Sequence, residues 1–316
     1  MLYGKYQFIC RFEKETILPE YKGSTLRGVF GHALKKVICA LKRQTCDTCL
    51  LKQKCLYCVI FETNQAIESK DSRIAAPPHP FVIEPPLTTQ THFSKNDTLE
   101  FQLILFGNIN HQLPYFIYAF DQIGKIGIGK HIHGQQGQFV LESVSRDQLM
   151  IYSNSDQNIQ IPNAFQPLVL SDVTEYPDTE LNLNVIFETP LRLKFENKLN
   201  ADIPFHVFVR SLLRRVSSLL NVYGQGEPDI DYRGIIKRAE QINIIHNNLK
   251  WVDWRRYSNR QDKEMLMGGI IGEITYKGHI GEYMPLIEFC STVHIGKQTT
   301  FGLGKFKAEI HNSIVT

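Results

Sequence analysis

Near its C-terminal end the chain carries a stretch rich in glycine and lysine, residues 294–306. Glycine adopts positive φ and allows a second backbone to approach closely. Lysines beside consecutive backbone N–H groups form a concave positive surface that suits phosphate. The stretch lacks the residue order of a P-loop, and Gly302-x-Gly304 precedes a strand-like segment, unlike a dinucleotide-binding fingerprint. It therefore predicts either a phosphate-binding loop or a glycine-rich turn before an edge strand.

The bulk properties of the sequence set wider limits. At about 150 residues per domain, the 316 residues suggest two domains. No apolar run reaches the roughly 18 residues of a membrane span, and residues 1–5 lack a signal-peptide core, so we expect a cytoplasmic protein. The net charge of +3 is small. Nucleic-acid binding would therefore depend on where the basic residues cluster.

The first amphipathic element is predicted at residues 24–43. A strand precedes it at residues 6–13, where apolar and polar residues alternate. Apolar residues then recur at helical spacing from Leu26 to Leu41. The opposite helix face carries Arg27, Gly28, Gly31, His32, Lys35 and Lys36. Each glycine destabilises a helix by about 1 kcal/mol relative to alanine. Two glycines on this face therefore predict that a large group lies against it.

Four cysteines follow in two C-x-x-C pairs within thirteen residues, Cys46, Cys49, Cys55 and Cys58. Two such pairs can together hold one tetrahedral zinc ion, although the gap between them is short. An iron–sulfur cluster, free thiols and disulfides stay open as alternatives. Four thiolates would leave no open coordination position. We therefore predict a structural metal, zinc, in an insertion at residues 44–62, and no catalytic metal.

The rest of the first half predicts strands at 81–84, 99–106 and 138–144 and a helix at 112–123. A second glycine- and lysine-rich loop, residues 124–134, precedes the last of these strands and contains Lys125 and Lys130. Each half of the chain therefore ends in a glycine-rich loop followed by a strand. This similarity between the two halves predicts two domains with the same topology.

The second half begins after a polar, turn-rich segment, 151–180, which we take as a linker. Strands are expected at 181–195, 249–257 and 267–276, and helices near 204–224 and 230–247. Arg210 and Arg214 lie on the polar face of the first helix. Aromatic and arginine residues alternate around Trp254, Arg255, Arg256, Tyr257 and Arg260, which suits base stacking and phosphate pairing. A core strand with a basic edge is the alternative.

Each half thus has the order strand, helix, strand, strand, helix, strand, which is the ferredoxin-like arrangement. The predicted fold class is α+β, with two tandem ferredoxin-like (RRM-like) domains. The N-terminal domain spans 1–150, and the C-terminal domain spans 181–316 with its glycine-rich loop at 295–305. A less regular α+β fold is the alternative.

The sequence resembles the CRISPR-associated endoribonucleases that process repeat RNA, within the RAMP superfamily. The resemblance rests on residues 23–35, the four-cysteine segment, residues 254–261 and the loop 296–305. It implies CRISPR repeat RNA as the partner, further CRISPR effector or adaptation proteins as associates, and no membrane. It also implies metal-independent cleavage, in which a ribose 2′-OH attacks the adjacent phosphate to give 2′,3′-cyclic phosphate and 5′-OH ends.

Under that resemblance His32 is the first candidate for general acid–base catalysis, a role that suits histidine near neutral pH. Lys35 or Lys36 would stabilise the charge that grows on phosphorus, with His294 and Tyr257 as reserves. The RNA-binding set is predicted to comprise Arg27, Lys125, Lys130, Arg210, Arg214, Arg255, Arg256, Arg260, Gly296, Lys297, Gly302, Gly304 and Lys305.

Two other functions fit the same residues. A subunit of an interference complex could share the fold and hold CRISPR RNA without cutting it. A zinc-clipped nucleic-acid adaptor would instead use its cysteines as the main interaction site. A metal-dependent nuclease is disfavoured because the sequence shows no compact carboxylate cluster.

Overall fold

The computed structural model describes residues 1–42, 44–67, 76–161, 165–173, 176, 179–193, 203–258 and 263–311; the side chains of residues 255–258 and 263–266 are excluded. The chain divides into two compact units. The first comprises Met1–Pro167 with Val222–Gly226, and the second Leu168–Asn221 with Glu227–Thr316. None of the described helices is both long and apolar enough to cross a membrane.

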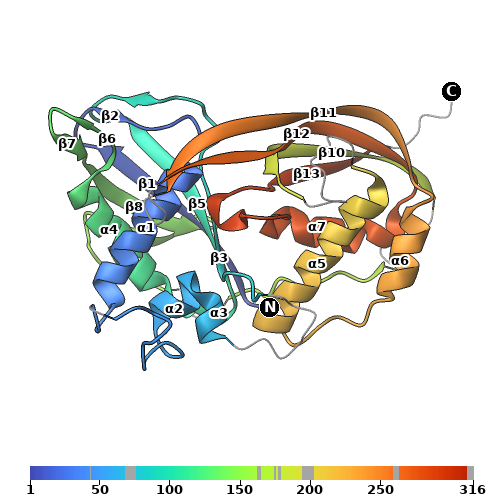
Figure 1. The fold of residues 1–316 in the computed structure, drawn as a ribbon, viewed down its shortest axis with the longest axis horizontal. Coiled ribbons are helices and arrows are strands. Elements are labelled where there is room, and N and C mark those ends of the chain that lie inside the picture. The colour runs from blue at the N-terminus through green and yellow to red at the C-terminus, as the bar shows by residue number, and fades with distance from the viewer. Residues whose placement is uncertain are drawn as a thin grey trace. The chain divides into compact units, whose positions relative to one another are not determined.

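The first unit is built on a five-stranded antiparallel sheet of order β3-β5-β1-β8-β9 (Figure 1). Its strands are β1 (Tyr3–Phe12), β3 (Phe81–Glu84), β5 (Thr98–Phe106), β8 (Phe139–Arg146) and β9 (Leu149–Ser153). Helices α1 (Gly23–Ile38) and α4 (Leu113–Ile126) connect β1 to β3 and β5 to β8. The shorter elements are β2 (Thr16–Ile17), α2 (Leu56–Phe61), α3 (Thr63–Ala66), β4 (His92–Phe93), η1 (Gly107–Gln112), β6 (Ile128–Ile132) and β7 (Gln135–Gly137).

Aromatic side chains join the helices of this unit to its sheet. Phe30 of α1 stacks on Phe120 of α4 with ring centroids 5.2 Å apart, and Phe120 lies 4.8 Å from Phe101 of β5. Phe8 of β1 stacks on Phe101 at 5.1 Å. All four rings are buried. The alternation of inward and outward residues along β1 matches the prediction from its sequence.

The second unit repeats the topology with a four-stranded antiparallel sheet of order β11-β12-β10-β13. Its elements are β10 (Glu180–Leu191), α5 (Phe205–Tyr223), α6 (Tyr232–Ala239), β11 (Asn243–Ser258), β12 (Lys263–His279), η3 (Gly281–Tyr283), α7 (Met284–Val293), η4 (Thr299–Phe301) and β13 (Phe306–His311). Helices α5 and α7 lie along one face of this sheet (Figure 1). Apart from β9, which adds a fifth strand at the edge of the first sheet, both sheets order their strands as second, third, first, fourth, and the predicted tandem ferredoxin-like α+β fold is confirmed.

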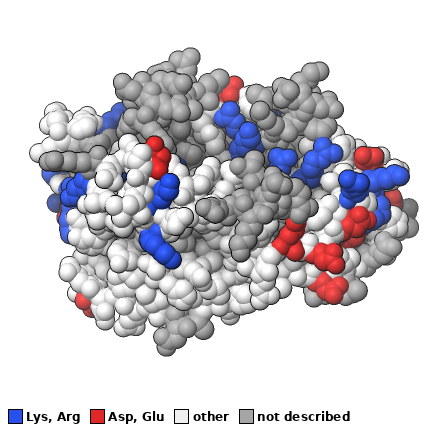
Figure 2. All heavy atoms as spheres, turned by 60° about the horizontal axis from the view of Figure 1, so that its bottom comes forward, with Lys and Arg blue, Asp and Glu red and all other residues white. Residues whose placement is uncertain are grey.

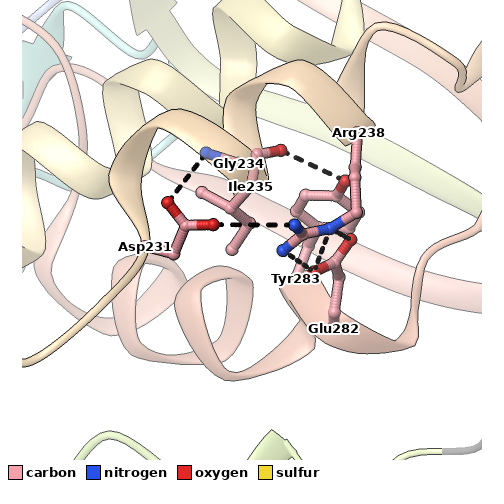
Figure 3. Close-up of polar contacts among 6 residues, drawn as sticks. All are labelled: Asp231, Gly234, Ile235, Arg238, Glu282 and Tyr283. Carbon is pink, nitrogen blue, oxygen red and sulfur yellow. Dashed lines mark hydrogen bonds and ion pairs between the residues drawn. The ribbon is translucent and has the colours of Figure 1, made fainter.

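A polar cluster fixes α6 beside the start of α7 (Figure 3). Asp231 caps α6 by accepting a 3.0 Å hydrogen bond from the Gly234 N–H. Arg238 donates to both carboxylate oxygens of Glu282 at 2.7–3.0 Å, and the Tyr283 hydroxyl donates to the Ile235 carbonyl at 3.3 Å. These bonds anchor the short helix, which buries only Ile235 and Ala239.

Two sequence predictions of local structure are wrong. The helix expected at 230–247 ends at Ala239, and β11 begins at Asn243, because the β-branched isoleucines that follow favour a strand. Lys125, expected in a loop, lies in the last turn of α4. The helix continues through Gly124. A Cβ at this position would lie 2.2 Å from the Phe139 carbonyl oxygen, so the close approach of the helix to β8 requires glycine.

Candidate functional site

Helix α1 presents two adjacent stripes of residues, each spaced by one helical turn. Gly28, His32 and Lys36 form one stripe. His32 and Lys36 are exposed, and a Cβ built at Gly28 would meet no atom of the described residues within 4 Å. The imidazole of His32 therefore lies on an open surface, with space on its N-terminal side and a cation on its C-terminal side.

The second stripe of α1 comprises Arg27, Gly31 and Lys35, and it is covered by aromatic rings of α2. The Arg27 guanidinium lies 5.0 Å from the centre of the Phe61 ring, and the Lys35 ammonium lies 5.4 Å from that of Tyr57. A Cβ at Gly31 would lie 3.1 Å from the Phe61 ring. We expected Gly31 to make room for a ligand; in the structure it makes room for Phe61.

In the second unit, the predicted glycine-rich loop is tied to the end of β10 by backbone and hydroxyl hydrogen bonds. The Thr189 hydroxyl donates to the Gly302 carbonyl at 2.8 Å and accepts from the Lys305 N–H at 2.9 Å. The Gly304 N–H donates to the Pro190 carbonyl at 3.1 Å, and the Ile295 N–H donates to the Gly304 carbonyl at 3.1 Å. The loop is thus fixed to the end of β10 by hydrogen bonds from both its first and its last residues.

The glycines of this loop are required by its backbone. Gly296, Gly302 and Gly304 have φ values of +81°, +83° and +73°. A Cβ at Gly304 would lie 1.8 Å from the Ile295 carbonyl oxygen, and one at Gly296 would lie 2.8 Å from that of Arg192. Their first role is therefore to close the loop, and contact with a ligand would be additional.

The two loop lysines differ in their surroundings. Lys297 is exposed, and its N–H donates to the Arg192 carbonyl at 3.0 Å. The Lys305 side chain is only 24% exposed, and its ammonium lies 3.6 Å from the Glu188 carboxylate, which also pairs with Lys307 at 2.6 Å. Lys297 therefore offers its charge to solvent more fully than Lys305 does.

The reserve candidate His294 is fully buried. Its Nδ1 lies 3.1 Å from the Leu303 carbonyl, to which it must donate, because a carbonyl only accepts. This bond joins the two ends of the loop from inside. A catalytic role would require RNA to reach a side chain that the structure encloses.

The remaining predicted cations lie on separate elements. Arg210 and Arg214 are exposed one turn apart on α5, Lys130 is exposed on β6, and Lys125 pairs with Asp121 at 2.7 Å. On the face drawn in Figure 2, Lys and Arg side chains form several separate groups, and those at one end alternate with acids. The side chains of Arg255, Arg256 and Tyr257, and all of Arg260, fall outside the described residues.

The four cysteines of the insertion sit on a turn and on the start of a helix. The Cys49 N–H donates to the Cys46 carbonyl at 3.3 Å, Cys55 precedes α2, and Cys58 is buried in its first turn. Burial first, then a hydrogen bond with Cys46 and the neighbouring charges of Cys46, Cys55 and Cys49, raises the pKa of the Cys58 thiol to about 12. Among the described residues, no group of three or more His, Cys, Asp or Glu side chains is arranged to hold a metal ion.

Some residues that shape these surfaces were missed by the sequence reasoning. Tyr57 and Phe61 cover α1, Thr189 anchors the glycine-rich loop, and the buried Arg215 donates to the Val293 carbonyl at 2.7 and 3.2 Å. Tyr57 lies inside the second C-x-x-C pair, which was the only sequence signal available for it. Arg215 follows Arg214 directly, so charge alone did not separate the buried arginine from the exposed one.

Comparisons with known families agree with this geometry. Residues 1–164 match the model of an N-terminal domain family, AF_1859_N, and residues 185–306 match that of the CRISPR-associated endoribonuclease Cas6. The first match lies in the first unit, and the Cas6 match, apart from Val222–Gly226, lies in the second unit, so the second unit is similar to the Cas6 endoribonuclease domain. An uncharacterized protein of Archaeoglobus fulgidus is 22% identical over 294 residues, which cover 92% of each chain.

Solved structures share the fold. A Cas6 product complex superposes with a TM-score of 0.57 at 14% identity, covering 98% of this chain and all of that one. Thermus thermophilus Cas6 gives 0.52 at 13% identity, with 98% of each chain covered. A chain of a partial Cas6-RT-Cas1–Cas2 complex gives 0.62 at 13% identity over 99% of this chain, which spans only 46% of that longer one.

Proposed function

We propose that this protein cuts CRISPR precursor RNA within its repeats, without a metal ion, to give 2′,3′-cyclic phosphate and 5′-OH ends. The observation that carries the proposal is the exposed His32 on the open stripe of α1, in a chain whose residues 185–306 match the Cas6 endoribonuclease model. His32 is exposed, and the open space at Gly28, where a Cβ would meet no described atom within 4 Å, would let a ribose–phosphate unit approach it.

The reaction needs one proton acceptor and one proton donor. The ribose 2′ oxygen forms a bond to phosphorus while the bond from phosphorus to the 5′ oxygen breaks. In the proposal His32 takes the 2′-OH proton or supplies the proton that the leaving 5′ oxygen gains, a contribution of about 10²- to 10⁴-fold. Lys36, one turn along, and Lys35 stabilise the negative charge that grows on the phosphate oxygens.

Other cations would hold the RNA backbone. We assign this role first to exposed residues of known placement: Lys130, Arg210, Arg214 and Lys297. Lys125 and Lys305 would contribute less, because each already pairs with a carboxylate, and Arg27, whose guanidinium lies over the Phe61 ring, stays in the proposed set. Arg255, Arg256 and Arg260 stay in the proposed set on their sequence alone.

We also propose that Cys46, Cys49, Cys55 and Cys58 hold one structural zinc ion. The support is their paired spacing: the first pair lies on a turn, and the second pair opens α2. Zinc would draw the thiolates into a tetrahedron. This site would brace the insertion and leave the cleavage chemistry to side chains.

The test is incubation of the purified protein with repeat RNA in EDTA. We expect cleavage that EDTA does not stop and products that carry a cyclic phosphate. His32→Ala should slow single-turnover cleavage at least 100-fold while RNA binding changes less than threefold. The matched control is His92→Ala, which removes another exposed histidine and should cut like the wild type. Cleavage by His32→Ala at the wild-type rate would move the catalytic role to His294 or Tyr257.

One observation favours a second candidate, a non-catalytic subunit that only holds CRISPR RNA. Among the described residues, none hydrogen-bonds the His32 imidazole, whereas catalytic histidines are commonly oriented by a partner. Under this alternative the wild type binds repeat RNA tightly and leaves it intact. In either case we propose CRISPR RNA as the partner. Association with adaptation proteins is suggested by the fold shared with the Cas6-RT-Cas1–Cas2 complex.

A further inference from the structure

We propose that Tyr57 and Phe61, on the helix that the cysteine segment opens, are positioning residues that orient Arg27 and Lys35 for RNA. This inference rests on the proposed function. It gives the cysteine segment a definite task, which is to build an aromatic platform beside the catalytic stripe of α1.

The spacing along α1 is the first argument. Arg27, Gly31 and Lys35 follow one another at intervals of four residues and so share one helix face. The middle position has no side chain, and the Phe61 ring takes its place, 3.1 Å from where a Cβ would lie. Along α1, one cation thus precedes and one follows the position that the Phe61 ring covers, and the glycine allows the ring to approach.

The rings themselves form a continuous surface. Tyr57 and Phe61 are stacked, with centroids 5.3 Å apart and planes 22° apart, and Phe61 also lies 5.4 Å from the buried Phe30. The guanidinium of Arg27 lies over Phe61 at 5.0 Å, and the ammonium of Lys35 lies over Tyr57 at 5.4 Å. Both distances are within the range of cation–π attraction.

This arrangement limits the rotamers of two long side chains before RNA arrives. An arginine or lysine on open surface loses rotamer freedom when it binds a phosphate, and a cation already held by a ring loses less. His32 and Lys36 lie on the neighbouring stripe. Arg27 and Lys35 therefore border the surface where the scissile phosphate is proposed to lie. The group that they would bind is a phosphate of the RNA backbone.

The cysteines explain how a short helix keeps its rings in place. Helix α2 has only six residues, too few for stability by itself. Cys55 precedes its first turn and Cys58 lies within that turn, so Tyr57 sits between them. The Cys55 N–H donates to the Leu51 carbonyl at 2.9 Å, and this bond ties the start of α2 to the preceding turn.

The experiment compares Tyr57→Leu with Tyr57→Phe. The leucine variant removes the ring, and the phenylalanine variant keeps it and removes only the hydroxyl. We expect Tyr57→Leu to weaken repeat-RNA binding about three- to tenfold and Tyr57→Phe to bind like the wild type. In combination with Lys35→Met, Tyr57→Leu should cause no further loss, since both changes remove one interaction. Tyr115→Leu, which alters a half-exposed tyrosine on α4, is the matched control and should leave binding unchanged.

A measurement without RNA separates this inference from the proposed function. With lysines carrying ¹³C-methyl labels, the Lys35 resonance should be displaced by the ring current in the wild type and in Tyr57→Phe but not in Tyr57→Leu. A displaced Lys35 resonance in a protein that does not bind repeat RNA would reject the proposed function alone. An undisplaced resonance in the folded wild type, or equal RNA affinity for Tyr57→Leu and the wild type, would overturn the platform.

Discussion

Replacing Thr189 by valine should detach the glycine-rich loop from β10 without changing side-chain shape. Thr189 is 2% exposed, and its hydroxyl donates to the Gly302 carbonyl at 2.8 Å while accepting from the Lys305 N–H at 2.9 Å. Valine removes both bonds and leaves a carbonyl and an N–H without that partner. A buried polar group left unsatisfied costs about 1–3 kcal/mol. Since Gly302 is buried and Lys305 is partly exposed, we expect a loss of about 2–4 kcal/mol.

Two measurements test this prediction, one of the loop alone and one of the stability of the whole protein. Hydrogen exchange followed by mass spectrometry should show faster exchange across residues 294–306 in Thr189→Val, because the loop opens from β10 more often. Denaturant unfolding should show the loss of stability. Thr189→Ser keeps the hydroxyl and is the matched control, expected within about 1 kcal/mol of the wild type. A second control is Thr275→Val, which removes one longer, partly buried bond of 3.2 Å to Asn184.

Two outcomes for Thr189→Val would contradict these expectations. If Thr189→Val unfolds within about 0.5 kcal/mol of the wild type and its loop exchanges no faster, the two hydrogen bonds do not hold the loop. If the loop loosens and repeat-RNA cleavage is unchanged, the loop is a structural closure of the sheet and not part of the RNA surface.

Three further predictions use other parts of the molecule. Protein purified without added metal should contain about one equivalent of zinc by elemental analysis, and metal-free protein with four titratable insertion thiols would contradict the zinc site. Neutralising Lys297 or Arg210 should weaken binding to many RNAs alike and reduce the salt slope by about one unit per phosphate contact; unchanged slopes would place the RNA elsewhere. Burial lowers the pKa of Lys22, whose ammonium donates to the Glu20 and Thr88 carbonyls at 3.0 and 2.9 Å. Between this lowered pKa and the ordinary value, the unfolded chain binds more protons than the folded protein. The free energy of unfolding of the wild type relative to Lys22→Met should therefore rise with pH in that window. If urea titrations show that this difference falls with pH, the prediction is wrong.

The fold was predictable because its signals are periodic and local. Alternating burial along β1 and four-residue spacing along α1 follow directly from the order of apolar residues. The same order, repeated twice, fixes the ferredoxin-like topology without knowledge of any long-range contact. Element boundaries failed where two local preferences competed, as at residues 240–247, where a helical pattern runs into β-branched isoleucines.

The candidate site was predictable only in part, because burial of polar residues depends on contacts between distant segments. His32 and His294 are both histidines beside glycine and lysine in the sequence, yet one is exposed and the other is enclosed. The difference comes from Leu303, nine residues from His294, which supplies the carbonyl that the enclosed imidazole binds. A local pattern contains no information about that partner.

Gly28 and Gly31 are a second case in which the sequence does not reveal the surroundings of a residue, and here the difference affects the proposed function. In the sequence, Gly28 and Gly31 look equivalent, two small residues on one polar helix face. In the structure, Gly31 admits Phe61 from the cysteine segment, and Gly28 faces open space. A substitution at Gly31 therefore disturbs the folded unit, whereas a side chain at Gly28 meets only what binds there. Any loss of RNA cleavage in Gly28→Leu, in a protein that melts like the wild type, would thus report directly on the surface where His32 is proposed to act.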